Sequence, residues 1–221
     1  MQKFDTPAPV SAVLDIPAGI IRFIAADRAD TTVEVLPADA AKGRDVKAAE
    51  QIEISYEDGV LRIEAPAAKN RILGSSGAVE VTVQLPAGSH VEAKAAAAEL
   101  RGVGRLGDVL FEGQQATVKL DETAGARLTL QAGDISLGRL GGPADITTQK
   151  GDLTIAEAVR GTVTLQTQHG NISIATAASA TLDAGTTYGR IHNTLKNPDG
   201  PTATVTIHAT TAYGNITAHS L

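Results

Sequence analysis

The sequence predicts an all-β protein whose larger part is a parallel β-helix, or β-solenoid, preceded by an antiparallel β region. Three segments carry this prediction, and each begins with glycine and a short Asp or Asn and continues apolar–polar–apolar: residues 133–137, 151–155 and 170–174. Their glycines are 18 and 19 residues apart. A fixed period of this size indicates stacked repeats that bury their apolar faces against one another. The alternation has the two-residue period of a strand, and the Gly-Asp or Gly-Asn pair favours a tight turn before it.

The same pattern recurs in weaker form at residues 107–111, 189–193 and 214–218. The last two copies are 25 residues apart, and the Asn-Pro-Asp-Gly-Pro segment at 197–201 is a turn-rich insertion that accounts for the longer interval. A stack of hairpins would join its strands through Asn-Gly or Asp-Gly. These repeats have the reverse order, Gly-Asp, which favours a parallel coil.

A second strand lies between successive glycine segments, and threonine is its middle residue in every repeat: Thr129, Thr147, Thr164, Thr181 and Thr206. With their apolar neighbours pointing inward, we expect these threonines to form one outward column at the inter-strand spacing of about 4.8 Å. High β propensity and favourable threonine pairs explain such a column structurally. The alternative is an interaction surface that contacts a partner or orders water, as in ice binding.

The first 36 residues are expected to form short strands separated by turns. Residues 10–16 alternate apolar and polar, a Pro-Ala-Gly turn leads into residues 20–25, and residues 31–36 follow a polar break. These strands would supply part of the antiparallel region.

Residues 44–51 are the best helical segment before residue 90, with Asp45 as the expected N-cap. Residues 52–56 and 60–64 then form a hairpin around Asp58-Gly59, which is the strongest local hairpin signal in the chain. The polar, glycine-rich residues 66–77 are interpreted as a surface loop. A binding loop for an acidic partner, using Lys69 and Arg71, is the alternative.

Residues 78–85 return as a strand and end in a second Pro-Ala-Gly turn. We therefore expect two continuous parts, an N-terminal β-strand region at 1–90 and solenoid repeats at 91–221. Residues 91–100 contain four consecutive alanines, which favour a helix by propensity. Their alternating start and their direct continuation into the repeats favour a strand, which is our prediction.

Composition excludes several classes of function. The net charge of −6 argues against a nucleic-acid partner. Three Tyr and three Phe, without Trp, are too few for a surface of stacking platforms, and the lack of cysteine excludes disulfides and thiolate chemistry. The N-terminus has no signal-peptide core and no apolar run reaches the roughly 18 residues of a membrane helix, so we expect a cytoplasmic protein without a membrane segment.

No catalytic residue, metal site or cofactor is predicted. The histidines occupy different positions relative to the repeat glycines, whereas ligands on a stacked coil would lie at matching positions. The residues after the glycines form a weak acidic column with Asp134 and Asp152 on adjacent turns, and their preference for tight turns explains it without a ligand. With Asp145 they are the one cluster that could serve a polysaccharide-cleaving β-helix as acid and base.

With these repeats in place, the chain resembles the bacterial "putative adhesin" family, also described as toast-rack or LiaG-like domains. The resemblance is carried by the N-terminal run of short strands, the apolar-Pro turn at 83–86 and the recurring Gly-Asp-Ile/Leu-x-Ile/Leu, and it covers nearly the whole chain. It implies a single-stranded right-handed parallel β-helix, or a closely related stacked β fold, with no established enzymatic activity. Many relatives are attached to a membrane segment, which we do not find in this sequence.

We therefore expect a non-enzymatic, adhesin-like β-solenoid that serves as a scaffold for protein interaction or self-assembly. Three residues follow the last glycine segment, so its strand is expected to be an open edge. We predict that a protein partner or a second copy binds this C-terminal rung around Ile216, or that N-terminal residues cover it. A cytoplasmic polymer resembling bactofilins is a variant of this function, and a glycan-binding or polysaccharide-cleaving β-helix is the alternative.

Overall fold

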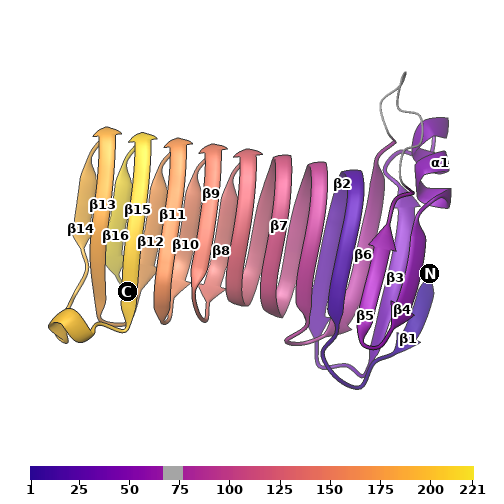
Figure 1. The fold of residues 1–221 in the computed structure, drawn as a ribbon, viewed down its shortest axis with the longest axis horizontal. Helices are drawn as coiled ribbons and strands as arrows, with labels where there is room; N and C mark the ends of the chain where they lie inside the picture. Colours follow the sequence, from indigo (N-terminus) through magenta and orange to yellow (C-terminus); the bar gives the residue numbers. More distant parts are fainter. Residues whose placement is uncertain (67–76) are drawn as a thin grey trace.

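The computed structural model describes residues 1–66 and 77–221, and in that part the protein is an elongated stack of strands with its N-terminal region at one end (Figure 1). The helices of the described residues are α1 (Gly43–Glu50) and the short 3-10 helix η1 (Gly200–Thr202). The predicted loop at 66–77, with Lys69 and Arg71, lies almost wholly outside the described residues. The all-β prediction is confirmed.

Each turn of the solenoid contributes one strand to each of two opposite faces. In spatial order, the first face contains β4 (Glu53–Glu57), β5 (Val60–Glu64), the first part of β2 (Ser11–Ala26), parts of β7 (His90–Ala132), β9 (Ala144–Lys150), β11 (Gly161–His169), β15 (Val205–Tyr213) and β13 (Ala180–Tyr188). The second face contains β1 (Gln2–Asp5), β3 (Asp30–Pro37), β6 (Val79–Pro86), the second part of β2, parts of β7, β8 (Ile135–Leu140), β10 (Leu153–Ala158), β12 (Ile172–Thr176), β16 (Ile216–Ser220) and β14 (Ile191–Thr194).

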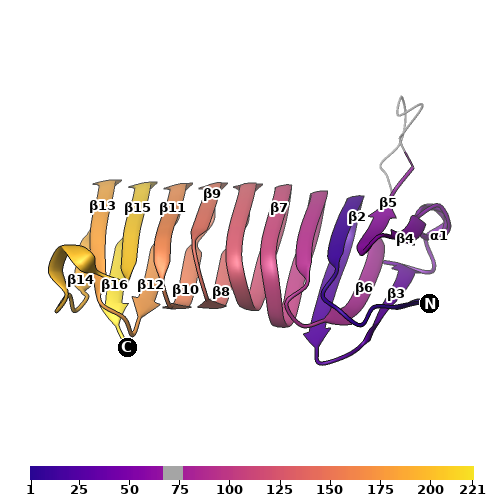
Figure 2. The same ribbon diagram turned by 60° about the horizontal axis from the view of Figure 1, so that its bottom comes forward.

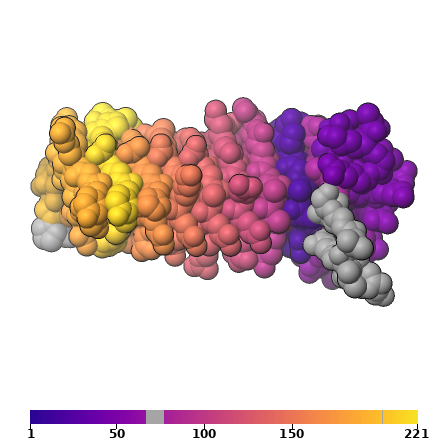
Figure 3. All heavy atoms as spheres, turned by 90° about the horizontal axis from the view of Figure 1, so that it is seen from above, coloured from indigo at the N-terminus to yellow at the C-terminus, as the bar shows by residue number. Residues whose placement is uncertain are grey.

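Strand direction separates the two ends of the molecule. The pairs β1–β3, β3–β6 and β4–β5 are antiparallel. Every pair that includes β2 or a strand stacked beyond it in space is parallel. This confirms an antiparallel region that leads into parallel turns. The space-filling view shows both as one elongated body (Figure 3), and one apolar core runs through both, from Leu14 to Ile216. The division at residue 90 remains a prediction.

The repeat glycines are required by the close approach of successive turns. Gly151 has φ +146°, and a Cβ at this position would lie 2.1 Å from the carbonyl oxygen of Gly133. A Cβ at Gly133 would lie 1.7 Å from the carbonyl oxygen of Ala116. Ala116 therefore occupies the corner of the preceding turn. Gly107, which we expected there, instead donates its N–H to the carbonyl of Ser89 at 2.8 Å, on the other side of the coil.

The apolar residues of each triplet fill the interior. Ile135, Leu153 and Ile172 stack in register on the second face, and each is about 1% exposed. Leu128, Ile146 and Leu165 do the same on the first face. Stacked aliphatic columns of this kind supply the burial that stabilises a solenoid, at roughly 25 cal/mol per Å² of apolar surface.

The last two turns are not stacked in chain order. β15 lies between β11 and β13, and β16 lies between β12 and β14, so the turn at residues 205–220 is inserted between two turns that precede it (Figures 1 and 2). Ile216, expected at an open C-terminal edge, is 0% exposed and pairs with Ile172 and Ile191. The predicted open rung at Ile216 is therefore wrong. The strand that covers it is β14, and not the N-terminal region.

A physical reason for this order lies in Asn193. It occupies the inward position that Ala218 and Ile174 fill in the neighbouring turns. Burying an amide in an apolar column costs about 1–3 kcal/mol when it has no partner. At the end of the stack Asn193 is exposed, and its Oδ1 accepts the N–H of Leu195 at 3.0 Å. The less apolar turn thus ends the stack, as terminal repeats commonly do.

The N-terminal predictions are largely confirmed, with two corrections. The hairpin of β4 and β5 forms around Asp58 and Gly59, both at positive φ, and residues 91–100 are strand. β2 runs through the Pro-Ala-Gly turn as one strand that passes from the first face to the second. Asp45 is not an N-cap: the cap position is Lys42, and the buried Asp45 carboxylate accepts the N–H of Ala78 at 3.1 Å.

Candidate functional site

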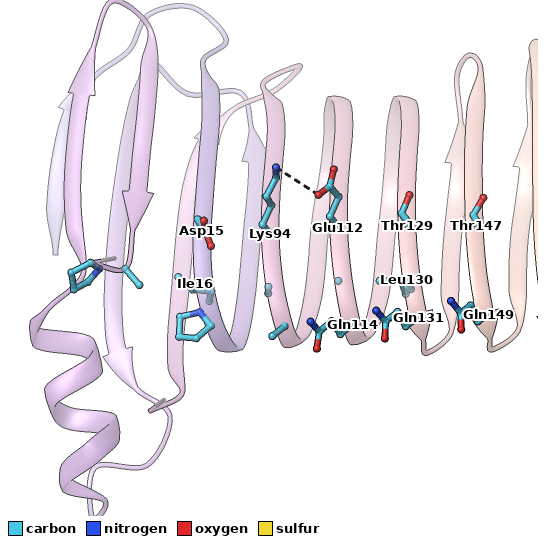
Figure 4. A pocket seen from close by; sticks show the side chains of 16 residues that line it. Asp15, Ile16, Lys94, Glu112, Gln114, Thr129, Leu130, Gln131, Thr147 and Gln149 are labelled. Carbon is cyan, nitrogen blue, oxygen red and sulfur yellow. Dashed lines mark ion pairs between the residues drawn. The ribbon is translucent and has the colours of Figure 1, made fainter. Parts of the chain in front are cut away.

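A shallow groove of about 780 Å³ crosses the first face between β2 and β9, beside Pro66. The side chains of Gln114, Gln131 and Gln149 lie in a row along it (Figure 4). Thr129 pairs with Thr147 and Ala132 with Lys150, which places Gln131 directly beside Gln149 on adjacent turns. The strand period points all these side chains outward, while the alternate residues enter the core.

The N-terminal part of the groove carries charge. Lys94 Nζ lies 3.6 Å from Glu112 Oε2, and Asp15 is the register partner of Lys94 on β2 (Figure 4). Both members of the Lys94–Glu112 pair are at least half exposed, so solvent and salt screen their attraction. The pair orients side chains at the rim and adds little to stability.

The predicted threonine residues fall into more than one column. Thr129 and Thr147 are neighbours in the groove. Thr164 pairs with Asp145 and His208, and Thr206 pairs with Thr162 and Thr181. The single column is therefore wrong. The register is set by the inward aliphatic residues and the corner glycines, and Thr164, Thr181 and Thr206 lie farther from their glycines than Thr129 and Thr147 do from theirs.

A different threonine column lies on the inner side of the first face, and three of its four members connect adjacent turns. Its members are Thr148, Thr167, Thr211 and Thr186, each three residues before a corner glycine. The hydroxyls of Thr167, Thr211 and Thr186 donate to the carbonyl oxygens of Gly151, Gly170 and Gly214 on the adjacent turn, at 3.1, 3.0 and 3.0 Å. The recurring Thr-x-x-Gly is the sequence signal of this column, and it lies outside the apolar–polar–apolar triplets.

The acidic column is a ladder of corner contacts. Asp134 Oδ1 accepts the backbone N–H of Asp152 at 2.8 Å, and Asp152 Oδ1 accepts that of Asn171 at 2.7 Å. Asn171 and Asn215 continue it by accepting the N–H groups of Asn215 and Arg190, both at 2.9 Å. The carboxylates thus hold the next turn in place. Asp145 lies near the start of β9, at the opposite end of that strand from the corner at Asp152, so these three aspartates do not converge.

Three aromatic rings are stacked on the first face near the end of the molecule. His169 lies on Tyr213 and Tyr213 on Tyr188, with ring centroids 4.9 Å apart in both pairs and interplanar angles of 12° and 8°. Tyr213 has a ring on each side, whereas Tyr188 is stacked on one side only, and both tyrosines are more than half exposed. Composition alone did not suggest that these dispersed residues meet.

Two aspartates have clearly lowered pKa values, and neither lines the groove. The Arg28 guanidinium, with the Lys3 ammonium, lowers the pKa of Asp30 from 3.8 to about 2. Lys42 lowers the pKa of Asp39 through a hydrogen bond. Ion pairing at the surface explains both shifts. Within residues 1–66 and 77–221, no three His, Asp or Glu side chains are grouped so that they could hold a metal ion.

Comparison with known proteins agrees with this architecture. A family model described as Toastrack DUF4097 matches residues 50–218. A solved structure titled as a "putative adhesin" of Bacteroides fragilis is 12% identical, with 98% of this chain and 95% of that chain covered and a TM-score of 0.50. A second "putative adhesin", from Parabacteroides distasonis, is 14% identical, with 100% and 95% covered and a TM-score of 0.42. No curated protein matches the chain. The likeness to the Bacteroides fragilis structure concerns the fold alone.

The described part of the chain also contains no helix that is both long and apolar enough to cross a membrane.

Proposed function

The chain belongs to the Toastrack DUF4097 family, and from this premise we propose that it is a non-enzymatic, adhesin-like scaffold that binds a protein partner along its first face. The observation that carries the proposal is the regular register of the turns. It sets the outward side chains in straight columns, so that on the first face the columns through Thr129 and Gln131 repeat neutral hydrogen-bonding groups from turn to turn.

The first face is the better binding face because the groove lies on it, and from residue 129 onward the columns that pass through the groove are uncharged. The column through the groove contains Thr129, Thr147, Gln166 and Thr210, and Gln131 and Gln149 stand beside it. On the second face Arg139 bridges Glu122 and Glu157 on the flanking turns, at 3.3 and 3.2 Å. The centres of protein interfaces are depleted of charged residues, since burying a charge costs more than burying an amide or a hydroxyl.

The partner that fits this face is a protein with a polar, hydrogen-bonding surface. Glutamine amides offer both donors and acceptors, so they can match backbone or side-chain groups of either kind. The Lys94–Glu112 pair at the rim would fix the orientation of the bound partner more than it would increase the binding affinity. Thr129 and Thr147 are the members of the predicted threonine set that line the groove, and the other three lie in other columns of the same face.

Site-specific photo-crosslinking tests the proposal. A photoreactive residue at position 131 lies in the groove, and one at the exposed position 119 lies on the second face of the same part of the solenoid. In the native host we expect a discrete crosslinked protein from position 131 and none from position 119. Its identity follows from mass spectrometry, and binding by the purified pair confirms it. Equal crosslinking at both positions, or binding unaffected by Gln131→Ala with Gln149→Ala, contradicts the proposal.

Glycan binding is the second candidate function, and the row of Gln114, Gln131 and Gln149 favours it because neutral amides match sugar hydroxyls. An immobilised glycan set, probed with the wild type and with the Gln131→Ala, Gln149→Ala variant, separates it from protein binding. Glycan cleavage has no comparable support, since the Asp134 and Asp152 carboxylates are engaged with backbone N–H groups. The cytoplasmic location remains a prediction that cell fractionation tests.

A further inference from the structure

The turn at residues 205–220 fills a slot between two turns that are consecutive in the chain. The flanking turns, residues 161–176 and 180–194, are joined by residues 177–179 and would be direct neighbours if the stack followed chain order. Instead β15 pairs with β11 on one side and β13 on the other, and β16 pairs with β12 and β14 (Figures 1 and 2).

The inserted turn and both flanking turns present the same side chains in each column. Thr211 lies between Thr167 and Thr186, and the corner glycine Gly214 lies between Gly170 and Gly189. Tyr213 lies between His169 and Tyr188. The hydrogen bonds that hold the inserted turn are therefore generic to the solenoid, and any chain with this turn sequence can make them.

An empty slot is not a stable alternative. Val205, Ile207 and Ile216 are 0% exposed, and removing them would expose the aliphatic residues of β11 and β12 to water. Closing the slot in chain order, with β14 on β12 and β16 outside β14, would bury Asn193 between Ile174 and Ala218. When the turn leaves, the occupant that restores every contact is the same turn from a second copy.

We propose that residues 205–220 are an exchangeable turn, and that two copies of the chain form a dimer in which each slot is filled by the partner's turn. The connection at residues 195–204, with its Asn-Pro-Asp-Gly-Pro segment, is the hinge that redirects the turn into the second copy. This exchange is independent of binding on the first face and adds a route to self-association through buried strands.

Single-cysteine variants test the exchange directly, because the natural chain has no cysteine. Gln166 and Thr210 are exposed register partners on β11 and β15. One chain carrying Gln166→Cys and another carrying Thr210→Cys are unfolded, mixed, refolded together over a range of concentrations and oxidised. A disulfide between the two chains requires Thr210→Cys of one copy to lie in the slot of the other.

The matched control uses Thr129→Cys on one chain and Thr147→Cys on the other, register partners in the same column but in turns that do not exchange. We expect several-fold more interchain disulfide from the slot pair than from the control pair, rising with protein concentration. Equal yields from both pairs overturn the proposal. A third sample contains Gly185→Cys as its single cysteine. If it forms covalent dimers at the same yield as the slot pair, the proposal is overturned as well, because the chains then associate through the open edge of β13.

Discussion

At the scale of single residues, the corners of the solenoid require glycine for steric reasons and not for flexibility. Gly133 and Gly151 lie where two turns approach so closely that a Cβ would enter the carbonyl oxygen of the preceding turn. Each is also at positive φ, which side chains disfavour. Glycine is therefore the residue that both the backbone conformation and the spacing of the turns allow.

Replacing a corner glycine should destabilise the protein markedly. We expect Gly151→Ala to lower the free energy of unfolding by about 1–3 kcal/mol, because the methyl group overpacks the corner at positive φ. Gly185 on β13 is the matched control, since a Cβ there meets nothing within 4 Å, and Gly185→Ala should be neutral or stabilising by up to about 1 kcal/mol. Urea unfolding followed by circular dichroism measures both, and equal effects would refute the steric account.

Asp30 should make stability depend on acid pH. Its pKa of about 2 in the folded protein lies below its ordinary value of 3.8, because Arg28 and Lys3 stabilise the charged form. The stabilisation is thus fully present above about pH 4 and is lost as the pH falls towards 2. We expect the difference in Tm between the wild type and Asp30→Asn to shrink over that range. A Tm difference that stays constant from pH 6 to 2 would contradict the assignment of this pH dependence to Asp30. Asp27 is an exposed neighbouring carboxylate, and the same pH-dependent difference for Asp27→Asn would contradict it as well.

At the scale of the strand, each turn is joined to the next by contacts that repeat with the corner. The hydroxyl of the buried threonine three residues before a corner glycine donates to the adjacent turn's glycine carbonyl, and the Asp or Asn after the glycine accepts a backbone N–H from the adjacent turn. A strand thus contributes to stacking through its ends as well as through its aliphatic middle. These polar contacts reinforce the register set by the aliphatic residues and the corner glycines, because a slip by one residue would break them.

The inner and outer threonines of one strand should differ in their effect on stability. Thr167 is 5% exposed and donates to Gly151, whereas Thr164 on the same strand β11 is partly exposed and points outward. Thr167→Val should cost about 0.5–1.5 kcal/mol, because it keeps the shape and removes the hydrogen bond. Thr164→Val should be close to neutral. Thermal unfolding distinguishes the two, and a larger loss for Thr164→Val would show that the outer position matters more.

At the scale of the whole molecule, the two ends are built differently. The N-terminal end is closed by antiparallel strands with charged side chains, such as Lys3 on β1 and Glu53 on β4, and by α1, which packs against β3 and β6. Charges of this kind discourage edge-to-edge pairing. The other end is the turn of β13 and β14, where Ile191 is 46% exposed while Ile216, one turn inside, is buried.

The stacking order should be readable from disulfides within one chain. Gln166 and Gly185 are both register partners of Thr210, on opposite sides of it. The Gln166→Cys, Thr210→Cys double variant should oxidise readily, because neighbouring strands are about 4.8 Å apart. Gln166→Cys with Gly185→Cys should not, since two strand spacings exceed the reach of a disulfide. The opposite pattern in a dilute monomer, assayed by thiol titration, would mean that the turns stack in chain order.

Much of this architecture could be predicted from short windows of sequence. The Gly-Asp corners, the apolar–polar–apolar triplets and the Asp58-Gly59 hairpin each depend on residues within a few positions, and all three are confirmed. Asp134 and Asp152 lie at successive corners, because each precedes an equivalent strand. The groove could not be predicted, because it depends on how β2, β7 and β9 lie side by side.

The amino-acid sequence alone therefore determined that the chain forms stacked β turns with glycine corners, since sterics and period-two burial act over a few residues. Tertiary structure alone decided the order of the last turns, the true threonine columns and the residues left at the open end. The reason is that the turns at 161–176, 180–194 and 205–220 share one register, so local geometry permits any order. The choice among orders depends on burying Ile207 and Ile216 while leaving Asn193 in water, a comparison that no local segment contains.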